Sequence, residues 1–114
     1  MNPRRGEVWL VDLGTPRGHE QAYERPAVVI QSDDLSRLST LVVIPTTAVV
    51  QRGAHRGTVI LQAGEGGLHE ESVALCYQIR VLDRSRLIRR LGKLSAAALA
   101  QIETTTAYVL GLAI

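Results

Sequence analysis

The residue types in this sequence that could do chemistry are mainly arginines beside apolar stretches. Of the 13 Lys and Arg residues, only Lys93 is a lysine. A guanidinium group presents a planar fork of donors that matches phosphate and can stack on bases. Arg25 stands out, because Pro26 and the apolar residues 27–30 follow it directly and would hold it on a fixed scaffold. This pattern favours phosphate binding at residue 25.

Two polar, arginine-bearing segments could supply further contacts to a phosphate backbone. Residues 14–25 form the first segment, and residues 50–57, with Arg52, form the second. Within the first segment, Tyr23 could stack on a base. For any single arginine, a solvated surface position that keeps the protein in solution is the competing interpretation. Arg25 is the exception, for the reason given above.

Other kinds of catalytic site are missing from the sequence. It has no glycine-rich phosphate loop, no GxSxG motif and no CxxC pair. The histidines 19, 55 and 69 lie far apart on polar or glycine-rich segments, so their spacing does not indicate a zinc site. We therefore expect neither a metal nor a cofactor. The acidic pair after His69 is interpreted as a solvated turn, and Cys76, within an apolar stretch, is expected to be buried.

The composition is that of one small globular domain, residues 1–114. The formal net charge of +2 permits nucleic-acid binding without demanding it. The first residues do not resemble a signal peptide, and no apolar run approaches the ~18 residues that a membrane-spanning helix needs. We expect a cytoplasmic protein that is not in a membrane.

Short apolar runs separated by turn residues predict a mainly β protein. The predicted strands are residues 7–13, 27–31, 40–47, 58–61, 72–75, 78–83 and 88–94. Pro26 suits the start of a strand, where its missing N–H costs no ladder bond. Ser95 is a good N-cap for a final helix that ends near Gly111. This order predicts a strongly bent antiparallel sheet or barrel closed by one C-terminal helix.

Gln78 and Arg80 lie two apart within one predicted strand and would share a face of it. On that face the glutamine could read a base edge, and the arginine could hold phosphate or guanine. A hydrogen-bonded pair between neighbouring strands is the alternative interpretation.

A set of short motifs, in order over nearly the whole chain, resembles the MazF/PemK family. The motifs are RGEVW at 5–9, DLG at 12–14, GHEQ at 18–21, RPAVVIQSD at 25–33, VIPTT at 43–47, ESVAL at 71–75, QIRVLDRSRL at 78–87 and GKLS at 92–95. The resemblance implies a MazF/CcdB/Kid-type SH3-like barrel and a homodimer. It also implies a toxin that cleaves single-stranded RNA at specific sequences without a metal, and a cognate antitoxin whose C-terminal tail covers the RNA groove.

By the same resemblance, Arg25 is the catalytic arginine and Thr47 the catalytic threonine. The reaction uses the 2′-hydroxyl of RNA as its nucleophile and leaves a 2′,3′-cyclic phosphate and a 5′-hydroxyl. Arg25 would stabilise the developing charge, whereas proton transfer by an arginine is disfavoured because its pKa lies above about 12. Glu20 could act as the base, or it could pair with Arg25 or Arg17.

The resemblance has two departures. His19 stands where a small residue is usual, so it either assists acid–base chemistry or is simply exposed. Thr46 stands where a leucine is common before the catalytic threonine. Because side chains alternate along a strand, only one of Thr46 and Thr47 can face the groove. The full set of candidate RNA-binding residues is His19, Gln21, Tyr23, Thr46, Arg52, Gln78, Arg80 and Arg84.

Two other functions compete with the ribonuclease. One is a CcdB-like toxin that poisons DNA gyrase without being an enzyme, and the other is an RNA-binding module that no longer cleaves. The gyrase poison would not need Arg25 and Thr47 together at adjacent strand ends, so the sequence favours the nuclease.

Overall fold

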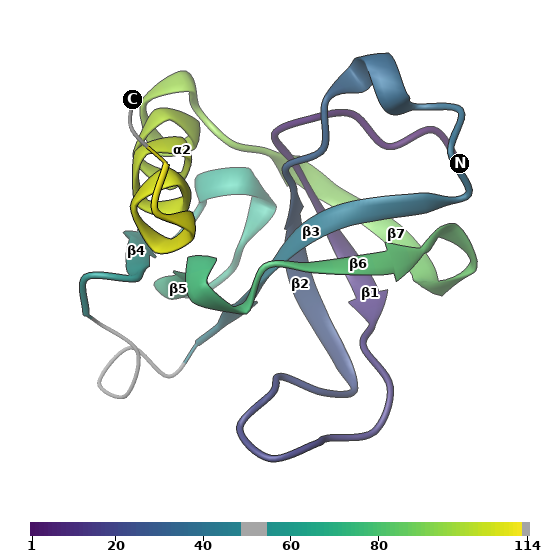
Figure 1. Cartoon of the computed structure of the whole chain (residues 1–114), viewed down its shortest axis with the longest axis horizontal. Helices are drawn as coiled ribbons and strands as arrows, with labels where there is room; N and C mark the ends of the chain where they lie inside the picture. The colour runs from purple at the N-terminus through teal and green to yellow at the C-terminus, as the bar shows by residue number, and fades with distance from the viewer. Residues whose placement is uncertain (49–54, 113–114) are drawn as a thin grey trace.

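The computed structural model describes residues 1–48 and 55–112, and its fold is a strongly bent antiparallel sheet with one C-terminal helix (Figure 1). The strands are β1 (Glu7–Asp12), β2 (Glu24–Val29), β3 (Thr40–Thr47), β4 (Thr58–Leu61), β5 (Ser72–Leu75), β6 (Arg80–Asp83) and β7 (Leu87–Lys93). The helix is α2 (Ala96–Leu110). Short 3₁₀ turns are η1 (Asp33–Leu35), η2 (Glu65–Gly67), η3 (Cys76–Gln78) and η4 (Arg84–Arg86). The predicted fold class is confirmed.

The long strand β3 organises the sheet. The strand order is β4-β5-β3-β2-β1-β7, and β6 also pairs with β3. The first half of β3 pairs with β6, from Thr40 opposite Asp83, and its end pairs with β5, where Thr47 lies opposite Val73. The sheet therefore bends along β3, and the two ends of this strand lie in different surroundings.

Strand β2 differs from its predicted bounds. It begins at Glu24 rather than Ala27, so Arg25 and Pro26 lie inside it, opposite Val11 and Leu10 of β1. Pairing with β3 on the other side begins only at Ala27. The proline is tolerated because the ladder to β3 has not yet started at its position.

The predicted strand over residues 78–83 is also shorter than expected. Gln78 ends the 3₁₀ turn η3, and β6 begins at Arg80. The prediction that Gln78 and Arg80 share a face of one strand is therefore wrong. The backbone turns at Cys76, where the Ile79 N–H donates to the Cys76 carbonyl, and this turn carries the chain from β5 to β6.

The central strands bury both of their faces, as the alternation of their side chains requires. On one face Val28 and Ile44 pack with Ala98 and Ile102 of α2. On the other face Trp9, Ala27 and the neighbouring apolar residues form a second cluster, closed by β6 and β7. Cys76 is fully buried in the first cluster, as the sequence predicts.

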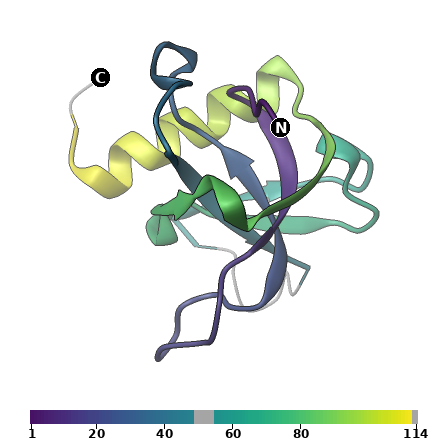
Figure 2. The same cartoon turned by 90° about the vertical axis from the view of Figure 1, so that its right-hand side faces the viewer.

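The last helix begins and ends at the predicted caps. The Ser95 side chain accepts a hydrogen bond from the Ala98 N–H, and Gly111 adopts a left-handed φ of 72° after the last turn. Figure 2 shows α2 lying along the sheet, while the β1–β2 connection projects away from it. We call residues 13–23, between β1 and β2, the hairpin loop.

Candidate functional site

A cavity of about 270 Å³ lies where the start of β2 meets the end of β3. Arg25 and Thr47 both line it, although they are far apart in sequence. The other lining residues are Pro26, Thr46, Ala48, Leu68, His69, Glu70 and Ser72. We call this cavity the Arg25 pocket. It brings a guanidinium, hydroxyl groups, an imidazole and a carboxylate to one opening.

The pairing of strands explains why these residues meet. Because β2 and β3 are antiparallel neighbours, the start of β2 lies beside the end of β3. The Thr46 hydroxyl donates to the Pro26 carbonyl at 2.9 Å, which links the two strand ends directly. Strand β5 then pairs with Thr46 and Thr47 from the other side and brings the residues before it to the pocket wall.

The two threonines have different surroundings. Thr46 is only 1% exposed, and its hydroxyl is used by the Pro26 carbonyl. Thr47 points to the opposite face and is half-buried at the pocket. Thr46 therefore uses its hydroxyl within the fold, and Thr47 is the one of the two threonines that is partly exposed at the pocket.

The hairpin loop leads directly into Arg25. Its residues His19, Glu20 and Tyr23 are exposed, and Gln21 is half-buried. Within residues 1–48 and 55–112, the ion pairs join Arg5 to Glu103, Arg86 to Asp12, and Arg90 to Glu7, so Glu20 and Arg25 are in none of them. The alternative in which Glu20 forms an ion pair with Arg25 or Arg17 is therefore not observed among the described residues.

Tyr23 has an unusual backbone. Its φ of 61° is left-handed, a conformation that a bulky side chain rarely adopts. Two backbone hydrogen bonds hold it, from the Tyr23 N–H to the Gly14 carbonyl and from the Leu13 N–H to the Tyr23 carbonyl. The residue is 62% exposed. Strain of this kind accumulates at functional sites, and here it lies two residues before Arg25.

His69 and Glu70 were not expected at the site, because the sequence around them was interpreted as a solvated turn. Both are exposed, and both line the Arg25 pocket. They arrive there because β5 starts at Ser72 and pairs with the end of β3. The sequence signal that could have found them is their position directly before that strand, but the pairing of β5 with β3 cannot be read from the sequence.

Arg84 is not brought to the pocket. It follows Asp83, which pairs with Thr40 at the other end of β3 from Thr47. Its guanidinium donates to the Leu38 carbonyl at 2.6 Å and also to the Ser36 carbonyl. This arginine therefore fastens the loop before β3, and the prediction that it contacts RNA loses its basis.

The remaining candidates lie in separate places. Arg80 is half-buried at the start of β6, opposite Val43. The Gln78 side chain is hydrogen-bonded to the hairpin loop rather than turned outward. Arg52 falls outside the described residues.

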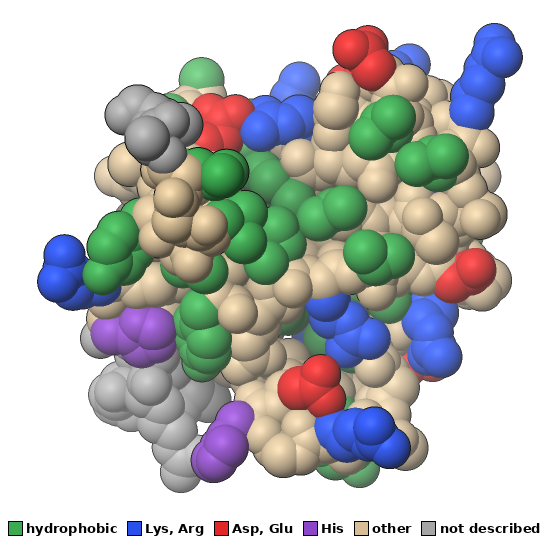
Figure 3. Space-filling model, viewed as in Figure 1, with side chains coloured by type: hydrophobic (Ala, Val, Ile, Leu, Met, Phe, Trp, Pro, Cys, Tyr) green, Lys and Arg blue, Asp and Glu red, His purple; other side chains and the backbone are tan. Residues whose placement is uncertain are grey.

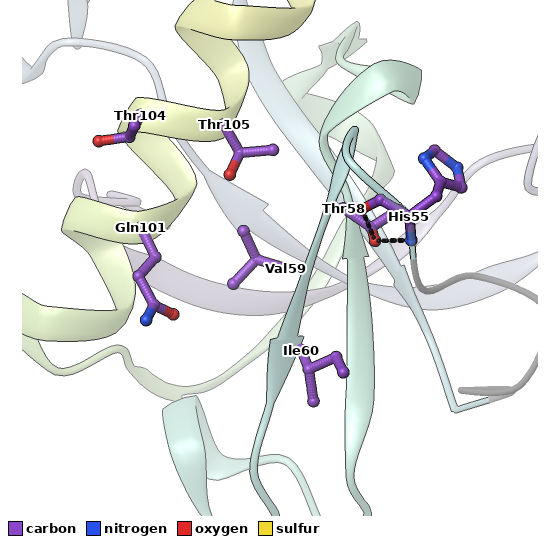
Figure 4. Close-up of a pocket in the computed structure, with 7 residues that line it drawn as sticks. All are labelled: His55, Thr58, Val59, Ile60, Gln101, Thr104 and Thr105. Carbon is purple, nitrogen blue, oxygen red and sulfur yellow. Dashed lines mark hydrogen bonds between the residues drawn. The ribbon is translucent and has the colours of Figure 1, made fainter.

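A larger cavity, of about 720 Å³, lies between β4 and α2 (Figure 4). It is lined by His55, Thr58, Val59, Ile60, Gln101, Thr104 and Thr105. His55 and Thr58 are bonded to each other there, since the His55 N–H donates to the Thr58 hydroxyl and this hydroxyl donates to the His55 carbonyl. Neither Arg25 nor Thr47 lines this cavity. The larger cavity is therefore not the candidate active site.

Two titratable groups away from the pocket, Glu7 and Cys76, have pKa values that are shifted by their places in the fold. Burial alone would raise the pKa of Glu7, but hydrogen bonds from the Arg4 N–H, Trp9 and Arg90 outweigh it and hold the pKa below its ordinary value. Burial raises the pKa of the Cys76 thiol, which makes it a poor nucleophile. Neither group lines the Arg25 pocket.

The described residues offer neither a metal site nor a membrane-spanning helix. In this part of the chain, no group of three or more His, Cys, Asp and Glu side chains is placed to hold a metal ion. Helix α2, the one α-helix found there, is too short to cross a membrane.

Comparison with known proteins adds independent evidence. Residues 4–110 match the family model described as PemK-like, MazF-like toxin of type II toxin-antitoxin system. Endoribonuclease MazF9 of Mycobacterium tuberculosis is 38% identical over 106 residues, which cover 88% of this chain and 89% of that protein.

Two solved structures from Deinococcus radiodurans have the same fold. The crystal structure of its MazF superposes with a TM-score of 0.84 at 26% identity, covering 98% of this chain and 99% of the other. A crystal structure of MazE-MazF contains a chain with a TM-score of 0.79 at 26% identity, covering 99% of each.

Proposed function

Because the chain belongs to the PemK-like, MazF-like toxins of type II toxin–antitoxin systems, we propose that it is an endoribonuclease that uses the Arg25 pocket to cleave single-stranded RNA at specific sequences. The cleavage needs no metal and leaves a 2′,3′-cyclic phosphate and a 5′-hydroxyl. The observation that carries this proposal is that Arg25 and Thr47 line one open pocket at the end of a rigid sheet.

The reaction makes and breaks one bond each at phosphorus. The 2′-oxygen bonds to the phosphorus as it loses its proton, and the bond from phosphorus to the 5′-oxygen breaks as that oxygen gains a proton. Negative charge grows on the two remaining phosphate oxygens. Arg25 stabilises this charge with its guanidinium donors, and the Thr47 hydroxyl donates to one of the same oxygens.

The protons require groups other than Arg25, whose guanidinium stays charged. Glu20 on the hairpin loop is the base that accepts the 2′-hydroxyl proton. It is exposed, and within the described residues no ion pair holds it, so it is available to substrate. His19 lies beside it on the loop, and His69 stands on the pocket wall, so these two imidazoles are the candidates to donate the proton to the 5′-oxygen.

RNA runs along the end of the molecule that carries the hairpin loop. Figure 3 shows charged and histidine side chains around this end, whereas hydrophobic side chains gather beside α2. The exposed side chain of Tyr23 offers a stacking surface for a base, and Gln21 and Arg80 are the further candidates to contact flanking nucleotides.

The partners are a cognate antitoxin and a second copy of the chain. The Deinococcus radiodurans crystal structure of MazE-MazF supports an antitoxin partner here, and we place the C-terminal tail of this partner in the RNA groove. The exposed apolar side chains that favour a homodimer are Ile60, Tyr77, Tyr108, Leu110 and Leu112. These lie on α2 and the elements next to it, away from Arg25. The toxin acts in the cytoplasm, where mRNA is translated, and the antitoxin neutralises it there.

The test is to treat a long RNA of known sequence with the purified chain, with and without EDTA, and to sequence the new 5′ ends. We expect cuts at one short motif, unchanged by EDTA, with 5′-hydroxyl ends that a polynucleotide kinase can label directly. Binding without cuts would identify a non-cleaving RNA-binding module instead. Cleavage that EDTA abolishes would reopen the question of a metal.

A further inference from the structure

The amide of Gln78 is hydrogen-bonded at both of its ends, and its partners lie in a distant part of the sequence. Its Oε1 accepts from the Gln21 N–H at 2.9 Å, 57 residues away. Its Nε2 donates to the His19 carbonyl at 3.1 Å and to the Tyr77 hydroxyl at 3.2 Å. A side chain held in this way is not free to read a base edge.

The hairpin loop needs an external support of this kind. Its other described hydrogen bonds join residues close in sequence, such as the Glu20 N–H to the Arg17 carbonyl. Gly14 and Gly18 have left-handed φ values of 80° and 56°, so the loop contains residues with wide conformational freedom. Without support from elsewhere, an exposed loop of this composition would populate many conformations.

The turn that carries Gln78 is well anchored. Cys76, at its start, is 0% exposed, and the Tyr77 N–H donates to the Gly57 carbonyl at 3.3 Å. The Tyr77 ring packs on the His55 ring with 4.9 Å between centroids. Gln78 therefore connects a turn anchored on the core to the exposed hairpin loop.

The two bonds to the loop bracket Glu20. One is made to the residue before it and the other to the residue after it, so Gln78 fixes the backbone on both sides of the proposed base. The neutral amide of glutamine supplies both the acceptor and the donor that these two backbone groups require. A carboxylate at residue 78 would face the His19 carbonyl with an oxygen instead of a donor.

We propose that Gln78 is a positioning residue, which orders the hairpin loop beside the Arg25 pocket and acts on RNA through Glu20 and its neighbours rather than by reading a base. This inference rests on the proposed ribonuclease function for its kinetic part. Its structural part, that the hydrogen bonds of Gln78 order the hairpin loop, does not depend on the ribonuclease function.

The experiment compares Gln78→Glu and Gln78→Met with the wild type. The first variant keeps the shape and loses the donor, and the second removes both bonds without adding charge. Gln62→Glu is the matched control, because it adds the same charge at an exposed glutamine whose described hydrogen bond uses only its backbone. Two readouts are needed: amide hydrogen exchange over residues 13–23, and kcat and KM for cleavage of one RNA.

We expect exchange at residues 13–23 to become about tenfold faster or more in both Gln78 variants, with the strands unchanged. We expect kcat to fall about 10- to 100-fold, with a smaller change in KM and with the same cleavage motif. The Gln62→Glu control should match the wild type in both readouts.

Two results would overturn the inference. Unchanged exchange in the loop, with cuts that move to a different motif, would make Gln78 a base-reading residue. Faster exchange with unchanged kcat would mean that loop order does not serve cleavage. If the wild type itself cuts no RNA, the ribonuclease proposal fails. The hydrogen-exchange measurement then still decides whether Gln78 orders the hairpin loop.

Discussion

Two arginines at opposite ends of β3 have opposite surroundings. Arg84, beside the start of β3, gives its guanidinium donors to the carbonyls of Leu38 and Ser36. Arg25, beside the end of β3, is exposed at a pocket, and no ion pair of the described residues includes it. In an arginine-rich chain, the difference between internal and outward-facing donors separates an arginine that holds the fold from one that holds substrate.

The same difference extends to the neighbouring elements. Near Arg84, Asp83 caps the 3₁₀ turn η4 by accepting from the Ser85 N–H. Hydrogen bonds from the Ser85 side chain and then from its N–H hold the pKa of Asp83 below the ordinary value. Near Arg25, the polar side chains of Glu20 and His69 face solvent. One end of the strand is closed by its own hydrogen bonds, and at the other end Arg25, His69 and Glu70 are exposed around a pocket.

Replacing Arg25, the exposed arginine at the pocket, gives the largest expected effect on RNA cleavage. Arg25→Ala should slow RNA cleavage by about 100-fold or more, because it removes the cation that stabilises the charged phosphate. The free energy of unfolding should change by less than about 0.5 kcal/mol, since the residue is exposed and contributes no core volume. Single-turnover cleavage and urea unfolding measure the two quantities. Undiminished cleavage in a folded variant would contradict the assignment.

Replacing Arg84, whose donors are used within the fold, should lower stability and leave cleavage nearly unchanged. Arg84→Ala should lower the free energy of unfolding by about 1–2 kcal/mol, because two backbone carbonyls lose a charged donor. Cleavage by the folded fraction should stay within about twofold of wild type. Urea unfolding and cleavage under conditions where the variant is folded test this. A stable variant with slow cleavage would return Arg84 to the RNA surface.

Tyr23 offers a smaller and more local test. Tyr23→Gly and Tyr23→Ala both remove the exposed ring, but only glycine tolerates the left-handed φ of 61° without strain. The glycine variant should therefore be more stable than the alanine variant by about 1 kcal/mol. Both should bind RNA more weakly, and to the same degree, if the ring stacks on a base. Equal stabilities in urea would show that the backbone there is not strained.

Glu7 gives the smallest effect, and it appears only in acid. Because the folded pKa of Glu7 lies below its ordinary value of 4.5, its contribution to stability is present above that value and is lost as pH falls through the folded pKa. Glu7→Gln should remove this part of the acid dependence, worth less than about 1 kcal/mol because its partner Arg90 is half exposed. Urea unfolding across acidic pH would detect it, and identical acid slopes would count against it.

Much of this comparison could be predicted from the sequence, because it depends on local patterns. Short apolar runs, Ser95 as a cap and Gly111 as a stop placed the strands to within a few residues and placed the last helix at its caps. The placing of Arg25 against a proline and an apolar strand indicated a fixed arginine. Each of these signals lies within a few residues of the feature that it predicts.

What could not be predicted depends on pairing between distant strands. The approach of His69 to the Arg25 pocket follows from β5 joining β3, and the bond of Gln78 to the hairpin loop spans 57 residues. The inward turn of Arg84 depends on the loop before β3 coming to meet it. The type of a side chain indicates what it can bind. Which groups it meets depends on how distant strands pair, and this pairing is not visible in the sequence.

The most direct test of the site is a double-mutant cycle on Arg25 and Thr47. The single-turnover cleavage rate is measured for wild type, Arg25→Ala, Thr47→Val and the double variant. If the two side chains act on the same phosphate, their losses are not additive, and the double variant is slowed by far less than the product of the two single effects. Losses that multiply would mean that the two residues act independently, and this would contradict a shared catalytic site.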